Sequence, residues 1–184
     1  DPEQPDAMLL ANGISTATAC VYVLLLACLF MVRLPAVAKY RELWPRVTAF
    51  LGSLLPFAVP FFPPADELPF EVHLCASAVS LAGMAAAVGI LCSLGRSFSV
   101  TPQVRQLVTS GPYRCLRHPL YAAEYVASLG ILMHYLSLWT VAITLAQGVL
   151  QIRRMIYEER LLRQVFPEYA AYAARTARIL PGVY

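Results

Sequence analysis

Long stretches without charged side chains alternate with short charged segments along this chain. Three of these stretches, Met8–Val32, Val47–Ala65 and Val72–Gly95, contain no Asp, Glu, Lys or Arg. A helix needs about 20 mostly apolar residues to cross a hydrocarbon core of about 30 Å. We therefore predict a membrane span in each stretch. The prolines of the second stretch, among them Pro56 and Pro60, predict a kinked helix that ends early.

A fourth apolar stretch, Pro119–Ile152, is too long for one span and short for two. Polar side chains between His134 and Ser137 predict a tight turn that divides it into a helical hairpin. The fold is thus expected to be an all-α integral membrane protein with five transmembrane helices. After the hairpin, apolar residues recur at helical spacing, which predicts an interfacial C-terminal helix beyond a break at Phe166-Pro167.

The basic residues fall on alternate connections between these spans. All 14 Lys and Arg residues lie between the first and second spans, between the third and fourth, or after the fifth. Cytoplasmic loops of membrane proteins collect Lys and Arg. The distribution therefore predicts an N-terminus outside and a C-terminus in the cytoplasm.

The composition agrees with a membrane protein. Hydrophobic residues make up 59% of the chain, charged residues 14%, and the mean hydropathy is +0.60. A soluble domain has about 45–50% apolar and about 25% charged residues, so an ordinary soluble enzyme is excluded. The net charge of +3 is too small to indicate nucleic-acid binding. The five cysteines are odd in number and lack a paired spacing, so we expect free, buried thiols and no metal site.

Polar residues concentrate in the second half of the single membrane domain, residues 94–184, after a three-helix scaffold over about residues 1–93. Ser110-Gly111-Pro112 predicts a turn, and Pro119 suits the first position of a helix whose exposed amides could bind a carboxylate. A plainer interpretation is a loop whose arginines meet lipid headgroups, with His118 capping the helix.

Three more residues are candidates for chemistry. Glu124 lies inside a predicted span, where an ionisable residue indicates a functional site or a structural pair. Arg154 and Glu158 are four residues apart and share a helix face. The plainer interpretation is an exposed ion pair, which would contribute only about a few tenths of a kcal/mol.

Taken together, these residues resemble the isoprenylcysteine carboxyl methyltransferase family of membrane enzymes. The resemblance covers about residues 94 to 182, roughly half of the chain. It is carried by several blocks in the family's order, with a hydrophobic hairpin of the right size between the first two and the last ones. The blocks are Leu107-Val108-Thr109-Ser110-Gly111-Pro112-Tyr113, Arg117-His118-Pro119-Leu120-Tyr121, Glu158-Glu159, and Phe166-Pro167-Glu168-Tyr169 with Tyr172.

The resemblance implies a site for S-adenosylmethionine (AdoMet) in the cytoplasmic half, closed by the C-terminal segment, with S-adenosylhomocysteine (AdoHcy) as the product. It also implies that Arg154 faces the carboxylate of the substrate. The positions that match the family's cofactor contacts are Gln103, Gln106, Leu107, Val108, Tyr113, His118, Pro119, Leu120, Tyr121 and Glu158.

The chemistry of methyl transfer suits these assignments. Tyrosine rings can stabilise the sulfonium cation of AdoMet, Glu158 can accept from its amino group, and His118 with the helix start can hold its carboxylate. A carboxylate nucleophile is already ionised at neutral pH and needs a cation such as Arg154 to orient it. An amine nucleophile would first lose a proton, and then Glu124 or Glu158 is the candidate base.

The acceptor does not follow from the family name. The chain is short, like prokaryotic members, so we expect a bacterial or archaeal cytoplasmic membrane with the active site facing the cytoplasm. Prokaryotes are not expected to supply prenylated CaaX proteins. We therefore expect a bilayer-partitioning acceptor such as a lipid, an isoprenoid or another prenylated compound, or a small thiol, and infer no obligate protein partner.

Three other functions stay open at this point. One is a phospholipid amine N-methyltransferase, and another is an NADPH-dependent enzyme like the steroid 5α-reductases. The third is a non-enzymatic membrane protein such as a transporter or an assembly factor. A transporter needs a polar path across the membrane, whereas the sequence predicts that intramembrane polarity is confined to one end.

Overall fold

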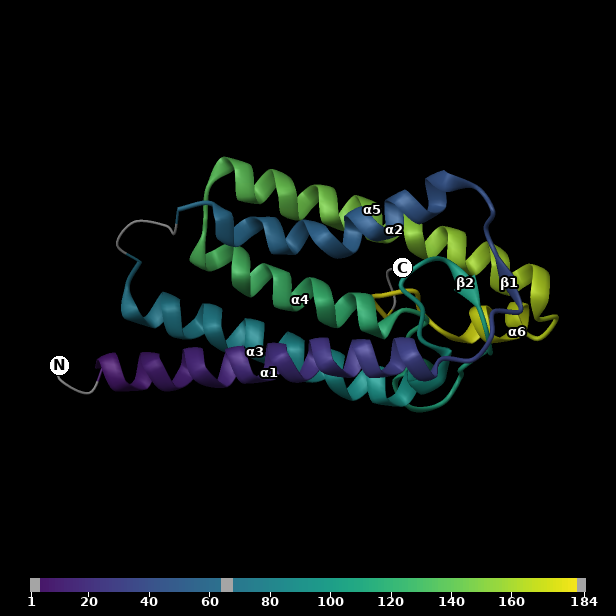
Figure 1. Ribbon diagram of the computed structural model, residues 1–184, viewed down its shortest axis with the longest axis horizontal. Helices are drawn as coiled ribbons and strands as arrows, with labels where there is room; N and C mark the ends of the chain where they lie inside the picture. Colours follow the sequence, from purple (N-terminus) through teal and green to yellow (C-terminus); the bar gives the residue numbers. More distant parts are fainter. Residues whose placement is uncertain (1–3, 64–67, 182–184) are drawn as a thin grey trace.

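The computed structural model describes residues 4–63 and 68–181, without the side chains of residues 4–12 and 15. The described chain is mostly helical, and the long helices run side by side (Figure 1). The two strands and the last helix lie at the end of the molecule opposite the N-terminus. In chain order the elements are α1 (Gln4–Val32), β1 (Ala38–Lys39), α2 (Leu43–Leu54), η1 (Leu55–Phe61), α3 (Phe70–Leu94), η2 (Gly95–Ser97), β2 (Gln103–Val104), η3 (Gly111–Arg114), α4 (Pro119–His134), α5 (Leu138–Val165) and α6 (Tyr169–Arg175).

The second apolar stretch forms the kinked helix that its prolines predict. The α-helix α2 ends at Leu54, and the chain continues as the 3-10 helix η1, which contains Pro56 and Pro60. Proline has no backbone N–H and cannot continue the ladder of an α-helix, which explains the change. The predicted end of this stretch at Ala65 lies outside the described residues.

The helical hairpin is present where the sequence predicts it. α4 ends at His134, and α5 begins at Leu138 after three connecting residues. Ser137 and Thr140 form a capping box, in which the Ser137 hydroxyl accepts from the Thr140 amide and the Thr140 hydroxyl accepts from the Ser137 amide. The predicted break is confirmed as well, because α5 ends immediately before Phe166.

Small residues bring α3 and α4 close together. A side chain added at Gly83 would collide with the backbone of Ala127, and one added at Gly130 would collide with Ser80. The Ser80 hydroxyl also donates to the carbonyl oxygen of Ala127 at 3.3 Å. Such small-residue contacts are typical of helices that pack in lipid, where close approach replaces the hydrophobic driving force.

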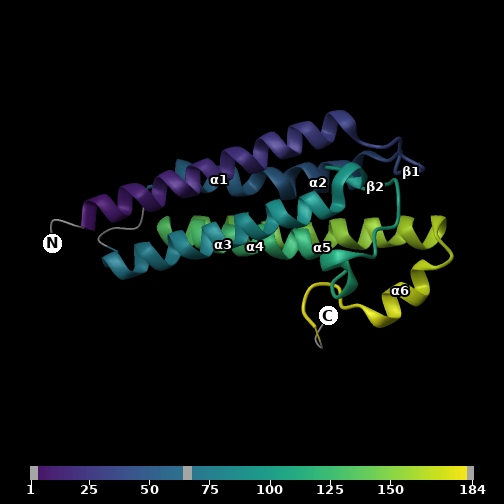
Figure 2. The same cartoon turned by 90° about the horizontal axis from the view of Figure 1, so that it is seen from below.

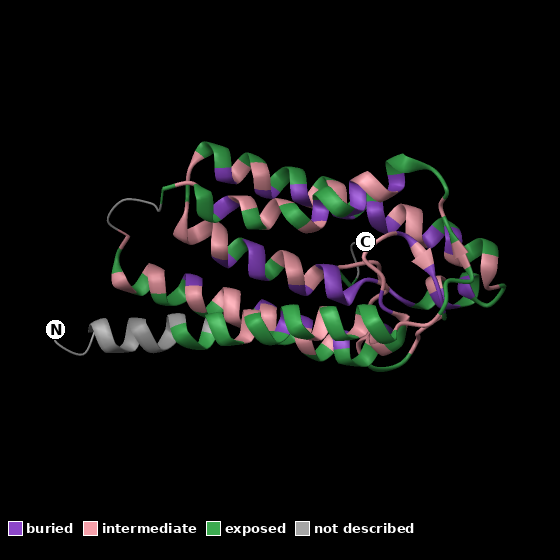
Figure 3. Ribbon diagram, viewed as in Figure 1, coloured by how far each residue is buried: buried purple, intermediate pink, exposed green. Residues whose placement is uncertain are grey.

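The distribution of apolar residues is the one expected where the surrounding solvent is lipid. Large hydrophobic side chains such as Met31, Phe61 and Leu138 are exposed, and exposed positions recur along the long helices (Figure 3). Polar side chains of α5, in contrast, are buried between helices. Within the described residues, one helical segment, Phe70–Ser97, is by itself long and apolar enough to cross a membrane, and a shorter apolar helix covers Thr16–Val32.

The cysteines are free, as predicted, but the prediction that they are buried is wrong. All five are exposed. Four of them lie on helices, and their side chains face outward from the bundle. An apolar side chain need not be buried in protein when the exterior of the bundle is itself apolar.

Backbone pairing organises the end of the molecule where the polar residues lie. β1 and β2 pair antiparallel, with Ala38 opposite Val104, which joins the segment after α1 to the segment after α3. A single bridge pairs Leu116 with Ala177. We call residues 176–181 the C-terminal segment; together with α6 it lies to one side of the helix bundle (Figure 2). The bridge between Leu116 and Ala177 holds the C-terminal segment against the start of α4.

Candidate active site

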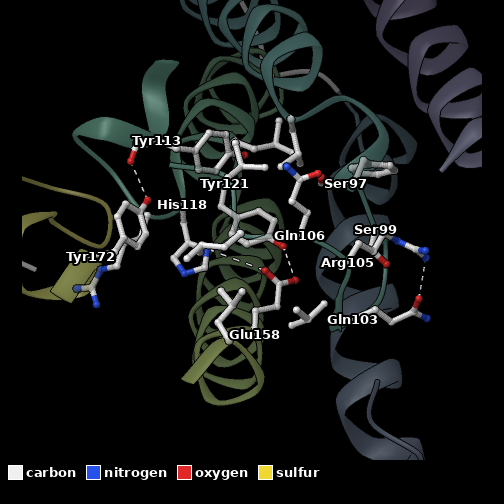
Figure 4. A pocket seen from close by; sticks show the side chains of 18 residues that line it. Ser97, Ser99, Gln103, Arg105, Gln106, Tyr113, His118, Tyr121, Glu158 and Tyr172 are labelled. Atoms are coloured by element: carbon white, nitrogen blue, oxygen red, sulfur yellow. Dashed lines mark hydrogen bonds and ion pairs between the residues drawn. The ribbon is translucent and has the colours of Figure 1, made fainter. Parts of the chain in front are cut away.

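A polar cavity, which we call the first cavity, lies between the loop after α3, the start of α4 and the C-terminal part of α5 (Figure 4). Its lining includes nine of the ten predicted cofactor contacts: Gln103, Gln106, Leu107, Val108, Tyr113, His118, Leu120, Tyr121 and Glu158. The tenth, Pro119, does not line the cavity. It is buried at the first position of α4, where its fixed φ angle starts the helix.

Glu158 is held at the edge of the first cavity by side chains from two helices. The Tyr121 hydroxyl donates to its Oε1 atom at 2.7 Å, and Arg154 Nε donates to the same oxygen at 3.2 Å. The His118 ring stacks on the ring of Tyr121 with centroids 5.5 Å apart. The four side chains therefore form one connected group, which crosses from α4 to α5.

Glu159 is a functional candidate that the sequence reasoning missed, although it stands beside Glu158 in the same motif. It is 1% exposed and accepts hydrogen bonds from Arg117, His118, Arg163 and Arg178, the last at 2.8 and 3.0 Å. Burial alone would raise its pKa. The hydrogen bonds from His118 and Arg178 and the charges of His118 and Arg117 outweigh burial and lower the pKa of Glu159 to about 2.

These contacts and backbone hydrogen bonds attach the C-terminal segment to the start of α4 and to α5, beside the first cavity. Arg117 N–H donates to the carbonyl of Ala177, and His118 N–H donates to the carbonyl of Arg178. From α6, the Tyr172 hydroxyl donates to the carbonyl of Tyr113 at 2.7 Å, and the side chain of Tyr172 lines the cavity. Burial raises the pKa of the Tyr113 phenol, so this residue stays neutral.

Arg105 brings a positive charge to the same cavity. Its side chain is buried and donates to the Gln103 side-chain oxygen at 2.8 Å. The Arg105 Nε atom is buried and has no hydrogen-bond partner within the described residues. Burial, and to a lesser extent the charge of Arg33, lower the pKa of Arg105. Both effects favour an anionic group beside Arg105.

A second cavity, of about 340 Å³ and with mostly apolar walls, lies between the helices. It is lined by residues of α1, α2, η1, α3, α4 and α5, so both halves of the chain build it. Phe98, Leu120 and Tyr121 line both cavities. These three side chains thus form a shared wall between a polar cavity and an apolar one.

Arg154 lies at that wall, on the side of the second cavity, and is 4% exposed. Besides its bond to Glu158, it donates to the Ser53 hydroxyl and to the carbonyl of Ser99, both at 3.0 Å. Its guanidinium carbon is 4.7 Å from the centre of the Tyr121 ring. The guanidinium is therefore fixed by three different segments of the chain.

Glu124 lines the second cavity and is hydrogen-bonded at both carboxylate oxygens. The Tyr22 hydroxyl of α1 donates to one oxygen, and Gln151 of α5 donates to the other at 3.3 Å. Neither Tyr22 nor Ser53, which contacts Arg154, belongs to the predicted site. Their helices match the family only in hydropathy, so the motifs gave no signal for them.

A buried polar stripe runs along α5 and corrects the prediction that intramembrane polarity is confined to one end. Its members recur every three or four residues and face the interior of the bundle: Thr140, Thr144, Gln147, Gln151 and Arg154 are buried, and Glu158 follows on the same face. The spacing could have been found in the sequence. It was hidden because the residues between these positions are strongly apolar.

Within the described residues, no three His, Cys, Asp or Glu side chains are grouped in a way that could hold a metal ion.

Comparison with known proteins connects this geometry to methyl transfer. A family model described as "Phospholipid methyltransferase" matches residues 72–169, which span α3 to the start of α6. A probable protein-S-isoprenylcysteine O-methyltransferase of rice (Oryza sativa) is 36% identical over a 96-residue match that covers 48% of this chain and 50% of the relative.

Two bacterial proteins are also similar to this chain, over matches of 76 and 82 residues. The cobalt-zinc-cadmium resistance protein CzcN of Cupriavidus metallidurans is 41% identical over 76 residues, which are 41% of this chain and 35% of the relative. The nickel-cobalt-cadmium resistance protein NccN of Alcaligenes xylosoxydans is 38% identical over 82 residues, 41% of this chain and 36% of the relative. The chain thus matches between about a third and a half of the length of these curated relatives.

Proposed function

This chain belongs to the phospholipid methyltransferase family; we propose that it is a membrane methyltransferase, which transfers the methyl group of AdoMet to the carboxylate of a lipophilic acceptor. The observation that carries this proposal is the pair of cavities with a common wall. A polar cavity suits a charged, water-soluble cofactor, and an apolar cavity suits an acceptor from the bilayer. Arg154 and Glu158 are hydrogen-bonded to each other across the boundary.

The residues of the first cavity fit the groups of AdoMet. The rings of Tyr113 and Tyr121 would meet the sulfonium cation, and Glu158 would accept from the amino group or a ribose hydroxyl. His118 and the cationic side chain of Arg105, which both line this cavity, would meet the carboxylate. When bound there, AdoMet supplies an activated methyl group on a positively charged sulfur.

Arg154 has the hydrogen-bonding capacity to orient a carboxylate. A guanidinium has five N–H groups. One at each nitrogen is used within the described residues, by Glu158, Ser53 and Ser99. One N–H is therefore left on each terminal nitrogen, and this pair can bind the two oxygens of a carboxylate. The bonds already made fix the guanidinium, so little ordering is required when the acceptor binds.

Catalysis on this scheme comes mainly from position. A carboxylate is ionised at neutral pH, so it needs no general base. Arg154 would hold one reactant, and the Tyr121–Glu158 group would hold the other on the opposite side of the shared wall. Bringing two reactants into line in this way replaces a bimolecular encounter with an effectively intramolecular one. The C-terminal segment and α6 would exclude water from the first cavity.

The proposal includes a membrane arrangement. The five spans are α1, α2 with η1, α3, α4 and the apolar part of α5, with the N-terminus outside and the first cavity at the cytoplasmic side of a bacterial or archaeal membrane. The positions of the 14 basic residues and the exposed apolar helix surfaces support this arrangement. AdoMet would then enter from the cytoplasm and the acceptor from the bilayer.

A phospholipid amine is the second candidate acceptor, and Glu124 is the observation that favours it. An amine has to lose a proton before it can accept a methyl group, and Glu124 is a carboxylate in the wall of the second cavity. Both of its oxygens are already hydrogen-bonded, to Tyr22 and Gln151. The O-methyltransferase name of the rice relative favours the carboxylate over the amine.

Isothermal titration of the detergent-solubilised chain with AdoMet, AdoHcy and NADPH tests the cofactor. We expect saturable binding of AdoMet and AdoHcy and none of NADPH. Binding of NADPH with no binding of AdoMet or AdoHcy would contradict the proposal and would favour a reductase.

A further inference from the structure

We propose that the acceptor carries a second hydrogen-bonding group, such as a hydroxyl or an amide, about 10 Å or less from its carboxylate, and that Gln147 and Gln151 bind it. This inference rests on the proposed function, because it takes the second cavity as the acceptor site. The mostly apolar walls of that cavity would not by themselves suggest a second polar group on the acceptor. A plain hydrocarbon tail would not provide that group.

The two glutamines are unusual residues for such a place. Gln147 is 2% exposed and Gln151 is 4% exposed, and both line the second cavity among mostly apolar side chains. They lie four residues apart on the inward face of α5. A polar side chain buried in a membrane helix is costly unless it is hydrogen-bonded, and in membrane proteins such residues mark substrate pathways.

The hydrogen bonds of these amides use only part of their capacity. Gln147 Nε2 donates to the Ser128 hydroxyl at 3.0 Å, and Gln151 Nε2 donates to Glu124. A glutamine side chain offers two N–H donors and an oxygen that accepts two bonds. Within the described residues, neither side-chain oxygen accepts a hydrogen bond, and neither is among the fully buried atoms without a partner. The remaining capacity is thus available to a molecule in the second cavity.

The geometry of α5 sets the distance between these two side-chain amides and the carboxylate end of the acceptor. Gln151 precedes Arg154 by three residues and Gln147 precedes it by seven, on the same face. At a rise of about 1.5 Å per residue, the two amides lie about 4.5 Å and about 10.5 Å along the axis from the level of Arg154. An acceptor whose carboxylate is held by Arg154 would therefore place its second polar group within that distance.

If the two glutamines only joined α4 to α5 by hydrogen bonds, a different result would be expected. Such a tie needs only the amide nitrogens, which already reach Ser128 and Glu124. Replacing Gln147 by leucine would then change stability without changing which acceptor binds. A binding role changes the preference between two acceptors that differ by one polar group.

The test compares stearate with 8-hydroxystearate, two acids that differ by one mid-chain hydroxyl. Their affinities for the detergent-solubilised full chain saturated with AdoHcy are measured for the wild type, for Gln147→Leu, and for the control Thr144→Val. Thr144 is buried on the same stripe, one turn away, but does not line the second cavity.

We expect the wild type to bind the hydroxy acid about tenfold or more tightly than stearate, because only the hydroxyl pairs with the open amide. Gln147→Leu should lose this preference while still binding stearate, and Thr144→Val should keep it. Equal affinities in the wild type, binding of neither acid, or an unchanged preference in Gln147→Leu would overturn the inference.

Turnover with AdoMet separates this inference from the proposed function. A preference in binding without any methyl ester would contradict carboxylate methylation and leave the polar subsite standing. Methyl esters formed equally well from both acids would support the proposed function and overturn the subsite.

Discussion

The two cavities differ in where their residues come from and in how well the sequence predicted them. The first cavity is formed largely by residues 94–121 with Glu158, Leu162 and Tyr172, and most of its predicted contacts line it. The second cavity draws on five helices and on η1, and apart from Leu120 and Tyr121 of the shared wall, only Arg154 and Glu124 of its lining are predicted site residues. A site for a highly polar molecule requires particular functional groups, and these leave a motif. An apolar cavity requires mainly space, which many sequences can provide.

The largest expected effect comes from the residue at the boundary. Arg154→Gln removes the charge that would orient the acceptor carboxylate, while the similar length of glutamine preserves most of the packing. We expect kcat/KM for a carboxylate acceptor to fall about 10²–10³-fold, as when a preorganised charged group is lost from an active site. Methyl-ester formation from radiolabelled AdoMet measures it. A loss of less than about threefold would mean that the acceptor is not held by Arg154.

A substitution at Glu159 tests whether cofactor binding in the first cavity depends on the C-terminal segment. Glu159→Gln removes the charge that Arg117 and Arg178 share, and breaking such a buried cluster costs about 3 kcal/mol of unfolding free energy. We expect a lower thermal midpoint and weaker AdoHcy binding together. The matched control is Arg163→Gln, because Arg163 is half exposed and its ion pair with Glu159 contributes little. An unchanged midpoint in Glu159→Gln would contradict the role of Glu159 as the anchor of the C-terminal segment.

The same residue predicts a pH dependence. The pKa of Glu159 is lowered from 4.5 to about 2, so its ionised form is favoured in the folded protein. The stability that it contributes is complete above about pH 5 and is lost as the pH falls from about 4.5 towards 2. Thermal unfolding of the wild type should therefore show a fall in midpoint over this range, and the fall should be shallower in Glu159→Gln. An equal fall of the midpoint with pH in both proteins would mean that a group other than Glu159 causes it.

The smallest effect is expected at Glu124, and it separates the two candidate acceptors. A carboxylate acceptor needs no base, so Glu124→Gln should change its methylation by about threefold or less, with glutamine still able to bond to Tyr22 and Gln151. Methylation of a phospholipid amine should instead fall about 10²-fold or more. Measuring both acceptors with the same variant decides between them. A large loss with the carboxylate acceptor would contradict the expectation that its methylation needs no base at Glu124.

The sequence predicted the helices well because their causes are local. Prolines ended α2, and the connection before Ser137 divided the hairpin. The sequence predicted long-range features poorly. Glu159 gathers arginines from the start of α4 and from the C-terminal segment, and Tyr22 reaches Glu124 from a helix about 100 residues earlier. These pairings depend on how the helices pack, and no local pattern encodes them.

The polar stripe of α5 is an intermediate case. Its period is visible in the sequence once α5 is known to turn Arg154 inward. The exposed cysteines are a second example. Burial cannot be predicted from hydrophobicity when the exterior of the bundle is also apolar. In both cases the missing information was which face of a helix meets protein and which meets the surroundings.

The central claim is that Glu158 serves the cofactor and Arg154 serves the acceptor, although the two side chains are bonded to each other. Titration of AdoHcy into Arg154→Gln and Glu158→Gln, each checked for an unchanged thermal midpoint, tests it most directly. We expect Glu158→Gln to weaken AdoHcy binding about tenfold or more, whereas Arg154→Gln should bind AdoHcy as the wild type does and form no methyl ester. Equal losses of AdoHcy affinity in the two variants would contradict the division of the site into two cavities with separate roles.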